Sequence, residues 1–296
     1  MFKMKSALCI VAIFSLALVS CVERIPEKTM PNVDNGAITM VKATVKPLVI
    51  EGIAGTGAYK WDGLRTLGIY GTSGGVNECY LPVKSTAGSN ESYFYGNVVA
   101  GDLTIYMPHS EEGGQRAIEG RVVVPSVQNY YADPLDHFMY NSTFLATTST
   151  DSVEFDYYAG LVKILIKYDV EEIVSVRVLV GNINTGYSEY IAGELSVVDG
   201  LLDENYSPSN NVFIENFGGV GSSTENPLAV WAVVAPGLYE NLVIEITDKN
   251  NVTITSPVSG PFEVSQCAVA SNVCVAEKID HNNTTDDFES EEGSYN

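Results

Sequence analysis

The chain has 296 residues, with 16 Lys and Arg against 37 Asp and Glu, and its formal net charge is −21 at pH 7. A protein that binds nucleic acid needs a basic face to neutralise phosphates, so this balance argues against a nucleic-acid partner. The length allows two domains of ordinary size or one large β domain.

The first residues have the layout of an export signal. Lys3 and Lys5 precede an apolar stretch, residues 7–19, which is too short to span a bilayer comfortably. The sequence Leu18-Val19-Ser20-Cys21 follows, and an aliphatic residue, two small or aliphatic residues and Cys form a bacterial lipoprotein signal. An ordinary secretory signal with a chance cysteine is the alternative.

The lipoprotein interpretation predicts the fate of Cys21. Residues 1–20 would be removed, the thiol would carry a diacylglycerol, and the freed amine could take a further acyl chain such as palmitate. Each buried CH₂ of such chains contributes about 0.8 kcal/mol, so several chains anchor a protein firmly. No other run is long and apolar enough to cross a membrane, and the rest of the chain is expected to fold in water while tethered.

Three cysteines remain beyond the signal and the lipid site: Cys79, Cys267 and Cys274. An odd number cannot pair completely within one chain. Cys267 and Cys274 could form a disulfide across a tight hairpin, or they could stay as two buried free thiols. Their C-x6-C spacing without a nearby His is a poor zinc pattern, so no metal site is expected.

Short strand-like segments, separated by Gly, Pro, Asn and Asp, follow a Pro- and Asn-rich linker at residues 21–36. This pattern predicts an all-β fold of the β-sandwich class. A polar gap near residue 150 suggests an N-terminal domain at 37–150 and a C-terminal domain at 151–280. The acidic tail, residues 281–296, lacks periodicity and is expected to be disordered.

Two segments predict which faces point inward. Four valines alternate with other residues on one face of a strand: Val174, Val176, Val178 and Val180. In the first predicted strand, residues 37–45, Val41 and Val45 share the face that we expect to cover the core.

No catalytic constellation is evident, so we expect no enzymatic activity and no cofactor. The segment "GTSGG" (71–75) is similar to the nucleophile loop of trypsin-like proteases, but it has Thr72 where that loop has Asp. Neither His109 nor His137 has the surroundings of a triad histidine. The Gly-rich segment 52–60 lacks the Lys-Ser/Thr ending of a phosphate-binding loop, and no helix pattern follows it.

Tyrosine pairs leave a glycan-binding role open. Tyr93 and Tyr95, or Tyr130 and Tyr131, could stack on sugars, or they could pack on a half-buried sheet as strand residues do. An exposed aromatic platform would favour glycan binding, and buried tyrosines would count against it.

Six stretches carry a resemblance to a known family. They are "AITMVKATV", "YKWDGLRTLGIYG", "VVAGDLTIYMPHS", "RVVVPSVQNYYADPLDHFMY", "VEFDYYAGLVKILIKYDVEEIVSVRVLVG" and "AVVAPGLYENLVIEITDKNN". In this order they resemble the fimbrillin-like (Mfa-like) lipoproteins, which are subunits of type V pili. The resemblance covers residues 21 to about 280, and the order of the stretches carries it because each is weak alone.

The resemblance implies two tandem transthyretin-like Greek-key β-sandwich domains after the lipoprotein signal and linker. It implies a structural subunit for pilus assembly or cell-surface adhesion, exposed on the outer membrane or built into fimbriae. Its partners would be other pilus subunits, bound by donor-strand exchange after a protease removes the first strand. A host or bacterial glycan or protein is a further implied ligand, and a surface glycan-binding lipoprotein is the alternative function.

The chain departs from this family at the expected cleavage point. The first Arg after the first strand is Arg65, which abuts the next strand, whereas Arg24 precedes the first strand. We therefore expect an anchor or accessory subunit that keeps its lipid and first strand, with Arg65 as the candidate cleavage site. Asp151-Ser152-Val153 resembles the three-residue O-glycosylation motif of bacteria that carry this family. Ser152 is thus a candidate glycosylation site, or otherwise a plain linker serine.

Overall fold

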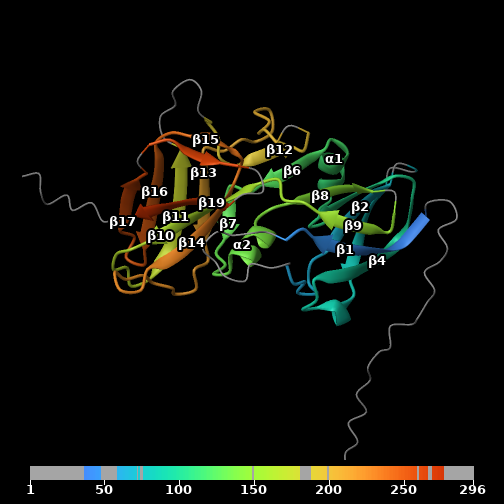
Figure 1. Cartoon of the computed structure of the whole chain (residues 1–296), viewed down its shortest axis with the longest axis horizontal. Helices are drawn as coiled ribbons and strands as arrows, with labels where there is room; N and C mark the ends of the chain where they lie inside the picture. Colours follow the sequence, from blue (N-terminus) through green and yellow to red (C-terminus); the bar gives the residue numbers. More distant parts are fainter. Residues whose placement is uncertain are drawn as a thin grey trace, which may run out of the picture. The chain divides into compact units, whose positions relative to one another are not determined.

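The computed structural model describes residues 37–47, 59–71, 73, 76–148, 150–180, 188–198, 200–258, 260–265 and 269–276; at 37, 38 and 269–276 the backbone alone is described. The described residues belong to one compact unit. Strands dominate the described residues, with two short α-helices, α1 (Gly113–Ile118) and α2 (Pro134–Tyr140), and one 3-10 turn, η1 (Lys84–Thr86) (Figure 1). This confirms the all-β class that the sequence predicts. None of the described helices is long and apolar enough to cross a membrane.

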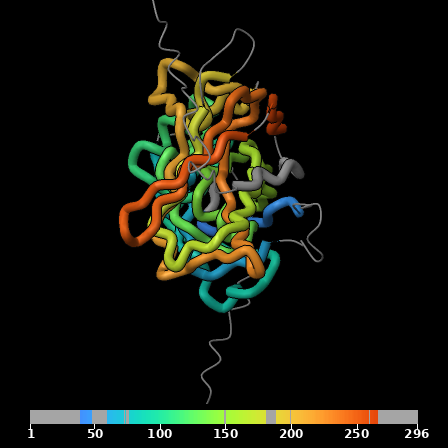
Figure 2. The backbone as a smooth tube through the Cα atoms, turned by 90° about the vertical axis from the view of Figure 1, so that its left-hand side faces the viewer, coloured from blue at the N-terminus to red at the C-terminus, as the bar shows by residue number. Residues whose placement is uncertain are grey.

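Figure 2 traces the path of the backbone, and Figure 1 labels β1, β2, β4, β8 and β9 of the first sheet. Seven strands form this sheet, in the order β8-β5-β2-β3-β4-β1-β9. Their bounds are β1 Ala37–Val45, β2 Leu67–Gly71, β3 Asn77–Pro82, β4 Glu91–Ala100, β5 Leu103–Met107, β8 Phe144–Thr148 and β9 Ser152–Phe155. The first part of β3 pairs with β2 and its last two residues pair with β4, so β3 passes between two halves of the sheet. The two outer strands of the sheet, β8 and β9, are separated by only three residues in the sequence, 149–151, and they contact each other. The sheet therefore folds back on itself.

Two further sheets form mainly from the C-terminal half of the chain. One has five strands, in the order β17-β16-β11-β13-β7, and the other has three, in the order β14-β10-β19. The bounds are β7 Val127–Asn129, β10 Gly160–Ile166, β11 Ile173–Val180, β13 Asn211–Glu215, β14 Leu228–Val234, β16 Leu242–Asp248, β17 Thr253–Pro257 and β19 Val269–Ala276. Two small pairs complete the set: β6 (Arg121–Val124) with β12 (Gly193–Ser196), and β15 (Gly237–Tyr239) with β18 (Phe262–Val264).

Strand pairing crosses the predicted domain boundary near residue 150. β9 follows the boundary and lies parallel to β1, whereas β7 precedes it and lies parallel to β13. The small β6–β12 pair also joins the two halves of the chain. The division into domains at 37–150 and 151–280, and their tandem transthyretin-like arrangement, stay predictions.

One strand departs from the predicted alternation. Three of the four valines in β11 are buried, but Val174 is 47% exposed. The pairing of β11 with β16 shifts register between Ile173 and Ser175. Such an irregularity rotates the side chains on one side of it, which places Val174 outside. The periodicity predicts the buried face correctly beyond this point and misses the irregularity.

Candidate functional site

The first strand, β1, covers the core of its own sheet. Val41 and Ala43 are fully buried and Val45 is 4% exposed, whereas Lys42 and Thr44 on the opposite face are partly exposed. A β-strand places alternate side chains on opposite faces, which explains this division. The inward face predicted from the sequence is therefore confirmed.

Both backbone edges of β1 are paired. It lies antiparallel to β4 on one side and, over residues 42–45, parallel to β9 on the other (Figure 1). The Lys42 N–H donates to the Asp151 carbonyl at 2.8 Å, and the Lys46 N–H donates to the Phe155 carbonyl at 3.0 Å. Ion pairs from Lys42 to Glu91 and from Lys46 to Asp156 flank the strand. Removing β1 would thus expose an apolar groove between two rows of unpaired backbone groups, which a strand could fill.

The candidate cleavage residue, Arg65, is buried just before β2. Its side chain is 7% exposed, and its guanidinium carbon lies 4.1 Å from the centroid of the Tyr140 ring. Nε and Nη2 have no hydrogen-bond partner among the described residues, and burial lowers the Arg65 pKa against the raising influence of Tyr59 and Asp62. A protease needs an accessible, extended segment. The folded chain therefore does not favour cleavage after Arg65, which stays a prediction.

Ser152 opens β9 and is exposed. Its position in the register lies opposite Lys42 of β1, and its carbonyl accepts from the Thr150 hydroxyl at 3.1 Å. An exposed hydroxyl at a strand end is open to a modifying enzyme. Glycosylation of Ser152 stays a prediction.

The cysteine predictions fall largely outside the described residues. Cys21 and Cys267 lie outside them, and only the backbone of Cys274 is described, in β19 opposite Ile164. Cys79 on β3 is an exposed free thiol. The lipid site and the 267–274 disulfide stay predictions.

One tyrosine pair points outward from a sheet face. Tyr93 and Tyr95 alternate with buried Ser92 and Phe94 on β4, and Tyr95 is 48% exposed. Tyr95 stands in register with Leu81 of β3, which is 47% exposed. Residues two apart on a strand are about 6.6–6.8 Å apart, so both tyrosines belong to one surface.

The other tyrosine pair and most other tyrosines have packing roles. Tyr130 stacks on Phe217 with ring centroids 4.5 Å apart, and Tyr131 stacks on Tyr140 at 4.7 Å. Among the described residues, six tyrosines are buried: Tyr59, Tyr80, Tyr106, Tyr157, Tyr168 and Tyr239. The outward surface on β4 is therefore the described place that best fits an aromatic platform.

A buried polar network was not predicted from the sequence. Gln128 of β7 and His137 of α2 are 1% and 0% exposed, and His137 Nε2 lies 3.1 Å from Gln128 Oε1. Asn141 at the end of α2 donates to the Asn129 and His137 carbonyls at 2.8 and 2.9 Å. The Pro-x-x-Gln spacing at 125–128 is the one signal that could have indicated it. The network joins β7 and α2 and contains no nucleophile.

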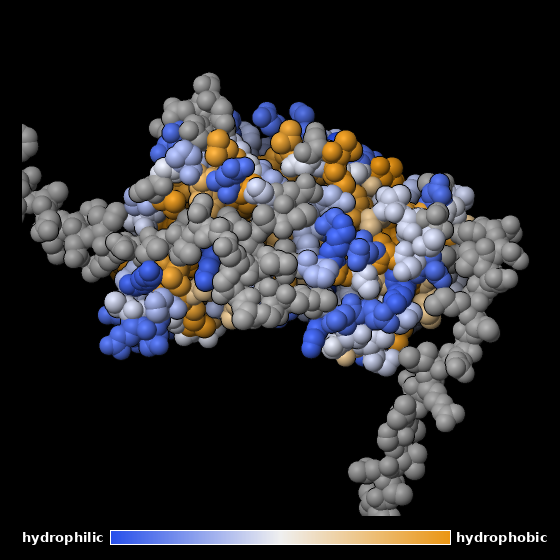
Figure 3. Space-filling model, in the orientation of Figure 1, coloured by the Kyte–Doolittle hydropathy of each residue, from blue (hydrophilic) through white to orange (hydrophobic). Residues whose placement is uncertain are grey.

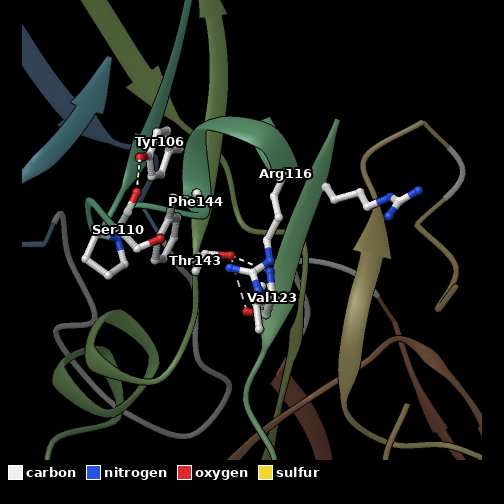
Figure 4. Close-up of a pocket in the computed structure, with 9 residues that line it drawn as sticks. Tyr106, Ser110, Arg116, Val123, Thr143 and Phe144 are labelled. Atoms are coloured by element: carbon white, nitrogen blue, oxygen red, sulfur yellow. Dashed lines mark hydrogen bonds between the residues drawn. The ribbon is translucent and has the colours of Figure 1, made fainter. Parts of the chain in front are cut away.

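A small cavity lies between α1, β6 and β8 (Figure 4). Its volume is about 30 Å³, and it is lined by Tyr106, Pro108, Ser110, Gly113, Arg116, Arg121, Val123, Thr143 and Phe144. The Tyr106 hydroxyl donates to the Ser110 carbonyl at 2.8 Å (Figure 4). A buried water needs about 10–15 Å³ of such space, so the cavity has room for a few water molecules and not for an organic substrate. Among the described residues, no three His, Cys, Asp or Glu side chains gather as a metal site would require.

No protein-family model and no curated protein matches the chain. Among solved structures, one similar chain is a protein from Bacteroides ovatus provisionally assigned to cell adhesion, with 12% identity, 77% of this chain and 87% of that chain covered, and a TM-score of 0.40. A protein from Bacteroides fragilis with the same provisional assignment has 11% identity, coverage of 82% and 94%, and a TM-score of 0.35. The tip fimbrial protein Mfa3 from Porphyromonas gingivalis, with a C-terminal truncation, has 9% identity, coverage of 74% and 81%, and a TM-score of 0.28. These similarities are too distant to establish a function.

Proposed function

We propose that this chain is a non-enzymatic, lipid-anchored fimbrillin-like subunit that serves pilus assembly or cell-surface adhesion. The Leu18-Val19-Ser20-Cys21 motif supports a lipid anchor at the outer membrane, with the folded part exposed on the cell surface. Two tandem transthyretin-like Greek-key sandwiches are the arrangement that we propose for the folded part. Its partners would be other pilus subunits.

The position of β1 is the observation that carries this proposal. The strand is paired on both edges and buries Val41, Ala43 and Val45. The groove that it fills is therefore as wide as one strand and is lined by apolar side chains. A strand from another subunit could satisfy the same backbone groups by β-augmentation. This geometry supports donor-strand exchange as the mode of assembly.

The burial of Arg65 supports an anchor or accessory position over a stalk position. A stalk subunit must lose its first strand before it accepts another, and the only Arg between β1 and β2 is the buried Arg65. A subunit that keeps β1 and its lipid would hold a pilus to the membrane or decorate it.

The N-terminus of the protein on cells tests this proposal. We expect mass spectrometry of the mature protein to find Cys21 with acyl chains as the first residue. A first residue of Thr66 would show cleavage after Arg65 and indicate a stalk subunit. A mature protein without acyl chains that begins elsewhere would contradict the lipid anchor.

Glycan binding is the second candidate, and the outward tyrosines on β4 favour it. Aromatic faces attract the apolar faces of sugars, and Tyr93 and Tyr95 share one surface beside the ion-paired Lys42 and Glu91. Loss of glycan-array binding in the Y93A/Y95A variant would support glycan binding. The control is V252A, which replaces an exposed valine in the β16–β17 turn and should keep the binding. Unchanged binding in Y93A/Y95A, or no binding by the unaltered chain, would reject it.

A further inference from the structure

Four exposed apolar residues lie on segments that meet at the end of the β6–β12 pair. Together they are named the end patch: Ile118, Val198, Leu201 and Tyr206, which are 48%, 94%, 62% and 39% exposed. Figure 3 shows hydrophobic residues on the upper edge of the molecule, over the elements that Figure 1 labels α1 and β12. Single exposed apolar residues are normal, but a group of them marks a contact surface.

Backbone hydrogen bonds hold the end patch in place. The Val197 N–H donates to the Gly120 carbonyl at 2.7 Å, which fixes the segment after β12 to the end of α1. The Ser196 N–H donates to the Leu201 carbonyl at 2.9 Å and closes the turn that carries Val198. These bonds attach the residues beside Val198 and Leu201 to the rest of the fold, which lowers the entropy that the protein would lose when a partner binds there.

The surroundings of the end patch are acidic. Tyr206 covers Arg121, whose guanidinium carbon lies 3.3 Å from the ring centroid. Arg116 and Arg121 form ion pairs with four carboxylates, those of Glu112, Glu119, Glu194 and Asp203. Four negative charges against two positive ones leave an excess of two negative charges beside the apolar side chains.

We propose that the end patch docks a polypeptide segment whose apolar centre is flanked by Lys or Arg. Apolar side chains of the partner would cover Val198 and Leu201, and its basic flanks would meet the excess carboxylates. A second copy of this chain fits poorly because each copy carries a net charge of −21. An anionic lipid surface would meet the same repulsion. This docking is independent of the strand exchange and glycan binding proposed above.

Binding of a synthetic peptide to the mature, full-length protein tests this docking. The probe is a 16-residue peptide with a central run of Leu flanked on each side by Lys, measured by fluorescence anisotropy at low and high salt. We expect binding that weakens with salt and that is at least about tenfold weaker in the V198S/L201S variant, as expected when anchor side chains are lost. The matched control is V98S/V252S, in which two valines that are 63% and 54% exposed elsewhere are replaced, and we expect it to bind like the unaltered chain.

Melting temperatures separate binding from folding, since all four replaced side chains are exposed and both variants should melt like the unaltered chain. Equal peptide binding by V198S/L201S and the unaltered chain would overturn the proposal, as would no peptide binding at all. A dimer in sedimentation that V198S/L201S dissociates would show that a second copy occupies the patch, and the proposal would be wrong. Binding to phosphatidylglycerol vesicles that V198S/L201S abolishes would replace the polypeptide partner with a membrane.

Discussion

Gln128 forms two hydrogen bonds with the backbone of Val233, 105 positions later in the chain. Its side-chain Nε2 donates to the Val233 carbonyl at 2.6 Å, and its Oε1 accepts from the Val233 N–H at 3.0 Å. The amide thus satisfies the edge of β14 as a neighbouring strand would. Because Oε1 must accept, His137 donates to it from Nε2, which fixes the tautomer of that histidine.

Replacing Gln128 with Leu should destabilise the fold. The variant leaves the N–H and carbonyl of Val233 buried without their partner, and each orphaned buried group costs about 1–3 kcal/mol. We expect urea unfolding to give a free energy of unfolding lower by roughly 2 kcal/mol or more. The control is Gln115→Leu on α1, an exposed glutamine, which should change the stability little. Equal stability of Q128L and Q115L would show that the network contributes nothing.

His137 predicts a pH dependence of stability. Burial lowers the His137 pKa from 6.5 to about 3. Below pH 6.5 the unfolded chain therefore binds a proton at His137, whereas the folded chain binds it only near pH 3. The contribution of His137 to the free energy of unfolding is thus fully present above pH 6.5 and is lost as the pH falls. Between pH 7 and pH 5 this loss is about 2 kcal/mol of the free energy of unfolding.

Chemical unfolding of the unaltered chain and of His137→Leu at both pH values measures this loss. The variant is less stable at pH 7, but its stability should fall by about 2 kcal/mol less between pH 7 and pH 5, because carboxylate titrations are common to both chains. Parallel losses in the two chains would mean that His137 does not stay neutral in the fold.

The sequence predicts local features of this fold better than distant ones. The alternation in 37–45 correctly predicts that Val41 and Val45 face the core, because burial of one face determines a strand's pattern. The same reasoning fails at Val174, where a register shift interrupts the strand. The alternation of apolar residues indicates which face of a strand is buried. It does not indicate where an irregularity interrupts the strand's pairing.

The candidate site residues show the same limit. That Arg65 would lie under the Tyr140 ring, or that Gln128 would bond to Val233, depends on contacts between distant segments. Neighbouring residues in the sequence do not indicate that a polar side chain is buried, because its hydrogen-bond partners come from distant parts of the chain. For the same reason the pairing of β7 with β13 and of β9 with β1 was not predicted.

Replacing Cys21 with Ser should release the protein from membranes. Serine lacks the thiol that receives the diacylglycerol, and without acyl chains the protein loses an anchor of about 0.8 kcal/mol per buried CH₂. We expect the C21S protein in the soluble fraction of lysed cells, while a Cys79→Ser control stays with the membrane. Membrane retention of C21S with an unchanged intact mass would remove the lipid anchor from the account.

Ser152 should carry a sugar in the native organism. Its side chain is exposed at the start of β9, and Asp151 and Val153 complete the motif. We expect the peptide that spans Ser152 to show an added glycan mass by mass spectrometry, and the Ser152→Ala protein to lose it. Detection of the unmodified peptide alone would leave Ser152 as a plain serine.

We propose that β1 occupies a groove that another strand can fill, and shortened chains test this most directly. A chain that begins at Asn35 should be monomeric, whereas one that begins at Pro47 should polymerise or melt lower, because it loses two buried valines worth roughly 1.5–3 kcal/mol each. A peptide of residues 35–47, added to the shorter chain, should restore a monomer and raise its melting temperature. Equal melting temperatures and monomeric behaviour of both chains, with no effect of the peptide, would contradict the account.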